Sequence, residues 1–165
     1  MTNQFTLLSD VCVNSSVHTV VAMGVYLGDK LQWVKQAVES LVTQSFKEYI
    51  IVIVIDGDIS DEILTYLIDT QRQCPNILLV RSSVNRGLSQ CMNFVIEWSL
   101  ENVKSAQYFF RMDADDISLE NRLEKQIDFL QKHPNVSVLG SGLIEINEQG
   151  EKVGQRKLPL KHHEI

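Results

Sequence analysis

The sequence of 165 residues has only three cysteines, and no two of them form a C-x-x-C pair. An odd, widely spaced set of Cys12, Cys74 and Cys91 predicts neither a disulfide framework nor a structural zinc site, and it is typical of reduced thiols. Long apolar runs are also lacking: residues 49–55 form the longest, far short of a membrane span. The N-terminus lacks the basic start and apolar region of a signal peptide. We therefore expect a cytoplasmic protein, and contact with the inner face of the plasma membrane is left open.

Two common nucleotide-binding sequences are absent as well. No G-x-x-x-x-G-K-[ST] sequence occurs, which excludes a P-loop site, and no G-x-G-x-x-G follows the first expected strand, which argues against a dinucleotide enzyme. Basic blocks are missing too, and the net charge is −6. Because nucleic-acid binders rely on neutralising phosphates, we expect no nucleic-acid partner.

The hydrophobic pattern predicts one α/β domain. Strands alternate with amphipathic helices, which is typical of a mainly parallel, Rossmann-like sheet with helices on both faces. The expected strands are residues 17–25, 49–55, 77–80, 107–112, 136–146 and 152–158, and the expected helices are residues 30–44, 61–72, 88–100 and 119–132. Residues 1–16 are polar and aperiodic, so we expect a loose lead-in followed by a domain over 17–165.

An acidic turn follows the apolar strand expected at 107–112, which we expect to be covered on both faces. Asp113, Asp115 and Asp116 crowd three carboxylates within four positions. Like charges at such spacing repel, and a hard divalent cation with oxygen ligands would neutralise them. The alternative is that the acids cap the next helix. A cap needs one acid, so the metal site is favoured.

Other polar turns follow neighbouring strands of the expected sheet. Gly24-Val25-Tyr26 ends the first strand, Asp56-Gly57-Asp58 ends the second, and Asn85-Arg86-Gly87 follows the third. Since ligands bind at the carboxyl ends of parallel strands, these turns are expected to share one edge with the acids. Tyr26 can stack on a base and Arg86 can meet anionic oxygens, so a metal-bound phosphate ester fits this edge.

Together these motifs resemble a known family. The sequence is similar to family 2 glycosyltransferases with the GT-A nucleotide-sugar-binding fold, of the bacterial exopolysaccharide and lipopolysaccharide type. The resemblance is carried by Met23-Gly24-Val25-Tyr26, Ile55-Asp56-Gly57, Asn85-Arg86-Gly87-Leu88 with Asn93, residues 111–118, Arg122, Gln126 and residues 138–141. It implies an inverting, metal-dependent transfer from a UDP- or GDP-linked sugar to a saccharide or lipid-linked acceptor in cell-surface polysaccharide biosynthesis.

The resemblance also implies roles for single residues. Tyr26 packs on the base, with the backbone of Gly24 and Val25 close to it. Ile55 stands where many members have a base-reading acid, so Asp56 or Asp58 would have to replace it. The remaining implied roles are ribose binding by Asp113, and binding of Mg²⁺ or Mn²⁺ by Asp115, with Asp116 as a second candidate ligand.

The resemblance places the general base downstream of the acidic turn, beyond Ile165. The catalytic residue is therefore unknown, and we expect a donor-binding part truncated at its C-terminus, whose bare surface could support self-association. Two alternatives stay open: a phosphotransferase or phosphatase that forms an aspartyl-phosphate on Asp113 with Asp115 as its partner, and a non-catalytic nucleotide-sugar-binding fragment. The phosphatase class also needs a later Lys and acidic pair, which the sequence does not offer.

Overall fold

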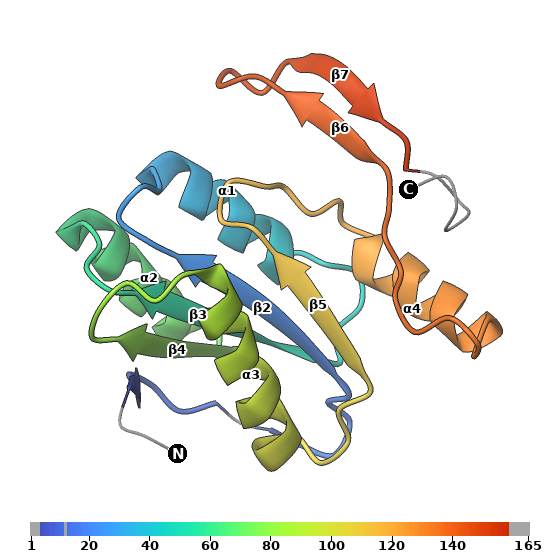
Figure 1. The fold of residues 1–165 in the computed structure, drawn as a ribbon, viewed down its shortest axis with the longest axis horizontal. Coiled ribbons are helices and arrows are strands. Elements are labelled where there is room, and N and C mark those ends of the chain that lie inside the picture. The colour runs from blue at the N-terminus through green and yellow to red at the C-terminus, as the bar shows by residue number, and fades with distance from the viewer. Residues whose placement is uncertain (1–3, 12, 159–165) are drawn as a thin grey trace. The chain divides into compact units, whose positions relative to one another are not determined.

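The computed structural model describes residues 4–11 and 13–158, and its core is a five-stranded sheet. The chain divides into two compact units, residues 1–125 and 126–165. The elements in chain order are β1 (Phe5–Leu7), β2 (Thr19–Val25), α1 (Leu31–Val42), β3 (Tyr49–Asp56), α2 (Asp61–Gln73), β4 (Ile77–Ser82), α3 (Leu88–Asn102), β5 (Tyr108–Met112), α4 (Arg122–Lys132), β6 (Leu143–Ile146) and β7 (Lys152–Arg156) (Figure 1).

The sheet of the first unit has the strand order β1-β4-β3-β2-β5. Strands β2, β3, β4 and β5 are mutually parallel, and only β1 runs antiparallel, against β4. The register pairs Val25 with Ile55 and Met23 with Met112, so the parallel strands end at one edge. The predicted mainly parallel α/β sheet is thus confirmed.

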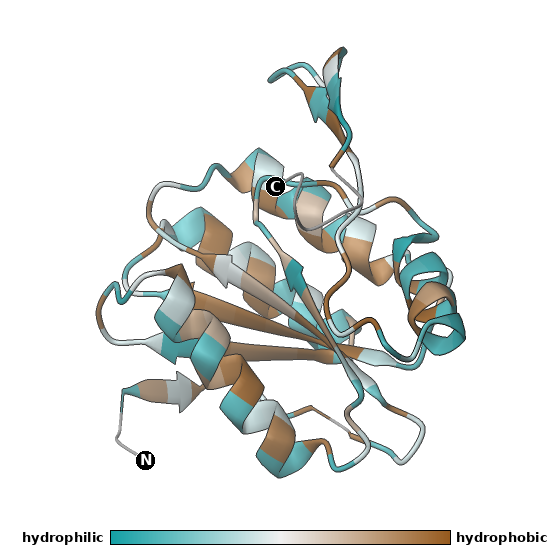
Figure 2. Ribbon diagram, turned by 45° about the vertical axis from the view of Figure 1, so that its right-hand side comes forward, coloured by the Kyte–Doolittle hydropathy of each residue, from teal (hydrophilic) through white to brown (hydrophobic). Residues whose placement is uncertain are grey.

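Helices cover both faces of this sheet, as the sequence predicts. Helix α3 lies on one face, where its Cys91, Met92 and Val95 pack against β2, β3 and β4 (Figure 1). Helices α1 and α2 lie on the other face. All eight residues of β3 are buried, and Figure 2 shows the strands as a hydrophobic layer between the helices. Burying one such aliphatic side chain stabilises the fold by about 1.5–3 kcal/mol, so this layer dominates the stability.

Local signals set several element boundaries. Ser60 is the N-cap of α2, and its side chain accepts a hydrogen bond from the Ile63 N–H at 3.3 Å. Helix α3 begins after Gly87, whose φ of 86° suits glycine best. Leu88 at the start of this helix is exposed, and the buried side is formed by Cys91, Met92, Val95 and Ser99.

Three further expectations need correction. The lead-in is not loose throughout, because β1 adds an edge strand to the sheet and Phe5 packs against the core. Strand β5 is not covered on both faces, because its burial alternates and leaves Phe109 exposed; it is also an edge strand of the described sheet, paired only with β2. The extended segment expected over 136–146 is a strand only from Leu143 onward.

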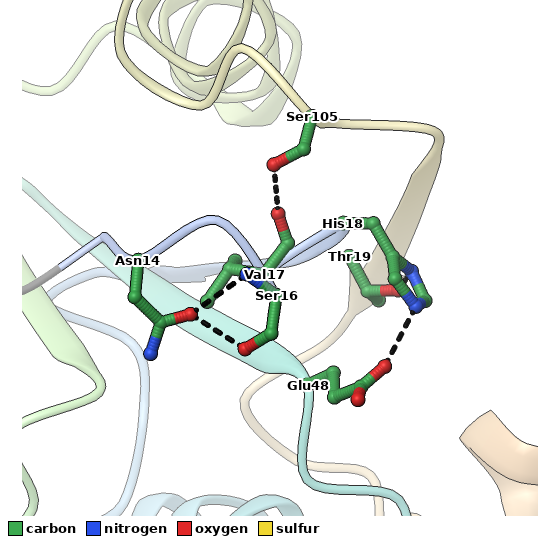
Figure 3. Close-up of polar contacts among 7 residues, drawn as sticks. All are labelled: Asn14, Ser16, Val17, His18, Thr19, Glu48 and Ser105. Carbon is green, nitrogen blue, oxygen red and sulfur yellow. Dashed lines mark hydrogen bonds and ion pairs between the residues drawn. The ribbon is translucent and has the colours of Figure 1, made fainter.

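The amino end of β2 carries a polar network (Figure 3). The His18 Nε2 lies 3.0 Å from a Glu48 carboxylate oxygen, and its Nδ1 lies 3.1 Å from the Thr19 hydroxyl. The Ser105 hydroxyl donates to the Val17 carbonyl, which ties the segment before β5 to the segment before β2. This network fixes the sheet edge opposite the predicted ligand edge.

The second unit contains a hairpin of β6 and β7. Its turn closes with hydrogen bonds from the Asn147 N–H to the Glu151 carbonyl and from the Gly150 N–H to the Asn147 carbonyl, both near 3 Å. Gly150 has a φ of 80°. The turn over 147–150 therefore joins the two strands. Across the described parts of the chain, no helix combines the length and the apolarity that a membrane crossing requires.

Candidate functional site: the carboxyl edge of the parallel sheet

The acidic turn lies directly after β5. The Asp113 carboxylate accepts a hydrogen bond from the Arg111 guanidinium at 2.8 Å, and the Asp116 N–H donates to the Asp113 carbonyl at 3.3 Å. Partial burial raises the pKa of Asp116, and the charges of Asp113 and Asp115 raise it further, while Arg122 and Arg111 oppose them. The three carboxylates therefore act on one another as the sequence predicts.

Arg122, at the start of α4, lies against this turn. Its guanidinium donates to the Arg111 carbonyl at 3.1 Å and lies 6.0 Å from the Phe110 ring centre. Burial lowers the pKa of Arg122, and the charges of Asp116 and Asp113 act in the opposite direction. A half-buried cation beside acids offsets part of their mutual repulsion, so the charges of the turn are partly balanced within the protein.

Gln44 fixes the segment that follows the acids, and sequence reasoning missed it. Its side chain is fully buried, and its amide group donates to carbonyl oxygens of Ser118 and Leu119. The amide oxygen accepts from the Leu123 N–H at 3.2 Å, and the Ser40 hydroxyl accepts a hydrogen bond from the Ser118 N–H. A glutamine at a helix end has no periodic signal, since its burial depends on partners more than 70 residues away.

The turn after β2 is closed by Asp29. Its carboxylate accepts from the Tyr26 N–H at 2.9 Å, and its own N–H donates to the Tyr26 carbonyl at 3.1 Å. A Cβ at Gly28 would lie 2.5 Å from atoms of the Tyr26 ring, so the ring lies over this glycine. Burial raises the pKa of Asp29, the Tyr26 N–H lowers it, and the charge of Asp115 raises it. The Tyr26 turn and the acidic turn are therefore electrostatic neighbours.

Gly24 and Val25 contribute to this edge mainly through their backbone. The Val25 side chain is fully buried, and a Cβ at Gly24 would meet Leu88 at an ordinary 3.5 Å. Tyr26, by contrast, is half exposed. Of the three residues predicted to contact the nucleotide on this turn, Tyr26 alone has an exposed side chain.

Asp56 is engaged within the protein. It is 5% exposed, and its two carboxylate oxygens accept from the N–H groups of Arg86 at 2.7 Å and Gly87 at 2.8 Å. A Cβ at Gly57 would lie 2.6 Å from the Asn85 nitrogen, so the turn after β3 touches the turn after β4 directly. Asp56 thus holds the Arg86 backbone at this edge of the sheet. Contact between Asp56 and the nucleotide stays a prediction. Asp58 is exposed and pairs with Arg81 at 3.0 Å.

The acids of this edge fit a divalent cation that arrives with its ligand. Within the described ranges, no three His, Cys, Asp or Glu side chains converge into a metal cage. Mg²⁺ in phosphate sites needs only one or two protein carboxylates, since phosphate oxygens and water complete its coordination. Asp115 and Asp116 would supply such a pair, and a cation there would offset the negative charges that help to raise the pKa of Asp116.

Comparison with known proteins decides the family. The protein-family model described as glycosyl transferase family 2 matches residues 21–164 of the sequence. The chain belongs to this family. The resemblance stated from the motifs is thereby confirmed, and β1 lies outside the matched residues.

Curated relatives of this family member include bacterial transferases. The amylovoran biosynthesis glycosyltransferase AmsE of Erwinia amylovora is 33% identical over 88% of this chain and 52% of its own length. The UDP-Gal:alpha-D-GlcNAc-diphosphoundecaprenol beta-1,3-galactosyltransferase of Escherichia coli is 28% identical over 86% of this chain and 50% of its own length. The chain thus spans about half the length of these relatives.

Solved structures agree on the fold. TarS 1–349 of S. aureus in complex with UDP has a TM-score of 0.60 at 20% identity, covering 84% of this chain and 38% of TarS. The mannosyltransferase PcManGT of Pyrobaculum calidifontis, in complex with GDP-Man and Mn²⁺, has a TM-score of 0.55 at 17% identity, covering 73% and 35%. The family 2 chain therefore has the GT-A fold predicted from its motifs.

Proposed function

We propose that this family 2 member binds a UDP- or GDP-linked sugar together with Mg²⁺ or Mn²⁺, as the donor-binding part of an inverting glycosyltransferase. The observation that carries the proposal is the acidic turn at the carboxyl end of β5, coupled electrostatically to the Tyr26 turn. A metal-bound diphosphate and a base can be held side by side there. Relatives named for amylovoran and diphosphoundecaprenol-linked sugars support a role in cell-surface polysaccharide biosynthesis with a saccharide or lipid-linked acceptor.

The chain's residues divide the work of binding. Tyr26 stacks on the base, the backbone at Gly24 and Val25 lines it, and Asp113, oriented by Arg111, accepts from the ribose hydroxyls. Asp115 and Asp116 hold the cation, which supplies positive charge to the leaving diphosphate when bound. Arg86 donates to oxygen atoms of the donor. The general base that would activate the acceptor hydroxyl, peripheral membrane contact and self-association remain predictions.

Calorimetry of the chain tests this proposal. UDP and GDP, with and without Mn²⁺, are titrated into the wild type and into Asp115→Ala. Metal-dependent binding of at least one nucleotide, reduced more than about tenfold by Asp115→Ala, is expected because a metal ligand is lost. The matched control is Asp69→Ala, which removes an exposed carboxylate paired with Arg72 and should leave binding unchanged.

The proposal fails if neither nucleotide binds in the presence of Mn²⁺. Mass spectrometry after exposure to a phosphoryl donor separates the main alternative, because only an aspartyl-phosphate enzyme would carry a phosphate on Asp113. Family membership argues against that alternative. A chain that binds the nucleotide and, in its full-length form, transfers no sugar would support the non-catalytic interpretation.

A further inference from the structure

Arg86 is held by contacts along its whole length. Its backbone N–H donates to Asp56, and its Nε donates to the Ser82 hydroxyl at 3.0 Å. Its guanidinium lies 5.9 Å from the ring centre of Phe5, within the range of a cation–π interaction. In the described part of the chain, no residue hydrogen-bonds its two terminal nitrogens. The end of the guanidinium fork is therefore available to an oxygen ligand.

Phe5 has a fixed place beside Arg86. The antiparallel register of β1 and β4 sets Phe5 opposite Ser82, the residue that receives the Arg86 Nε. The Phe5 ring also stacks on Phe94 of α3, with centroids 4.4 Å apart and an interplanar angle of 26°. One strand pair thus supplies both side chains that hold the guanidinium.

Strand β1 lies outside the residues that match the family, which begin at residue 21. We propose that β1 is an accessory strand of this chain, through which Phe5 positions Arg86 to donate to oxygen atoms of the nucleotide donor. The inference rests on the proposed function. Phe5 is a positioning residue here, because it touches Arg86 and has no assigned contact with the donor.

The physical advantage is pre-organisation. A free arginine side chain carries about 2 kcal/mol of rotamer entropy, which is lost when it binds a ligand. A guanidinium already held by Ser82 and Phe5 has lost part of this freedom on folding, so less is lost on binding. Arginine also presents a planar pair of donors, which suits phosphate or carbonyl oxygens.

Calorimetry with UDP and GDP in the presence of Mn²⁺ tests the role of the Phe5 ring. Phe5→Leu keeps an apolar side chain and removes the π face, so we expect affinity to fall about threefold. Phe5→Tyr keeps the ring face and should restore wild-type affinity. Leu7→Ala is the matched control: it perturbs the same strand and should lower stability without changing affinity, because Leu7 lies opposite Val80 and lines a cavity of about 330 Å³, whereas Phe5 lies opposite Ser82.

A double-mutant cycle with Arg86→Gln identifies the path of the effect. Arg86→Gln alone should weaken binding roughly tenfold, and Phe5→Leu should then cause no further loss. The same comparison with UMP and GMP locates the contact: a Phe5→Leu effect that persists without the β-phosphate assigns the Arg86 contact to the rest of the nucleotide, and one that vanishes assigns it to that phosphate.

Three results would overturn the inference: unchanged affinity in Phe5→Leu, equal losses in Phe5→Leu and Phe5→Tyr, or a further loss from Phe5→Leu when Arg86 is already glutamine. Failure of the proposed function is distinct, because the wild type would then bind neither nucleotide with Mn²⁺.

Discussion

Asp56 offers the sharpest test of how the ligand edge is built. Its carboxylate accepts hydrogen bonds from the Arg86 and Gly87 N–H groups at 2.7 and 2.8 Å, and it is 5% exposed. A hydrogen bond to a charged group is worth about 1.5–3 kcal/mol. Asp56→Ala removes two, so we expect the free energy of unfolding to fall by about 3 kcal/mol or more. Asp56→Asn keeps one acceptor oxygen and should lose roughly half as much.

Urea unfolding followed by far-UV circular dichroism measures this loss. For a domain of this size, about 3 kcal/mol corresponds to a lower Tm by roughly 6–12 °C. The control is Asp58→Ala, two residues on, whose side chain is 90% exposed and pairs with Arg81. Exposed pairs contribute about 0–1 kcal/mol, so Asp58→Ala should stay near the wild type.

Hydrogen exchange gives a residue-level check. The Arg86 and Gly87 amides should be protected in the wild type and in Asp58→Ala, and should exchange faster in Asp56→Ala because their acceptor is gone. If Asp56→Ala costs less than about 1 kcal/mol, or if these amides keep their protection, Asp56 does not hold the loop.

Two further predictions concern buried groups. Gln44→Ala strips the partners from the carbonyl of Leu119 and the N–H of Leu123, and should lower the free energy of unfolding by about 2–4 kcal/mol in urea titrations, whereas an equal midpoint for the two proteins would contradict the role assigned to Gln44. Burial raises the pKa of the Cys91 thiol to about 12 from 9.0, with the charge of Asp56 adding to the effect. As the pH rises, the unfolded chain therefore loses the Cys91 proton before the folded chain does. The contribution of the protonated thiol to the free energy of unfolding is complete below pH 9 and is lost between about pH 9 and 12, by at most about 1.4 kcal/mol per pH unit. The stability difference between the wild type and Cys91→Ala should shrink over that range, and a constant difference would refute this prediction.

Much of the framework could be predicted from the sequence because its signals are local. The continuous apolar run of β3 indicates a central strand, and Ser60 before an acidic first turn indicates a helix start. The acidic turn is likewise recognisable from its spacing after β5. These features depend on neighbours a few residues apart, so a single sequence contains them.

The missed features depend on distant partners. Strand β1 has three residues and exists through its pairing with β4, about 75 residues later. The partners of Asp56 lie 30 residues on, and those of Gln44 more than 70. The one-sided exposure of β5 follows from its edge position in the described sheet, which periodicity over an apolar run does not reveal.

The contact between Gly57 and Asn85 has a consequence for engineering and for evolution. With a φ of 85° and a Cβ that would lie 2.6 Å from the Asn85 nitrogen, Gly57 lies backbone against backbone with the loop after β4, so a side chain at position 57 would force that loop to move. Exchanging either loop for that of a relative would therefore require moving both loops as a matched set. Libraries that randomise Gly57 alone should return mostly destabilised chains, and lineages in which Gly57 changed should carry a compensating change in the loop after β4.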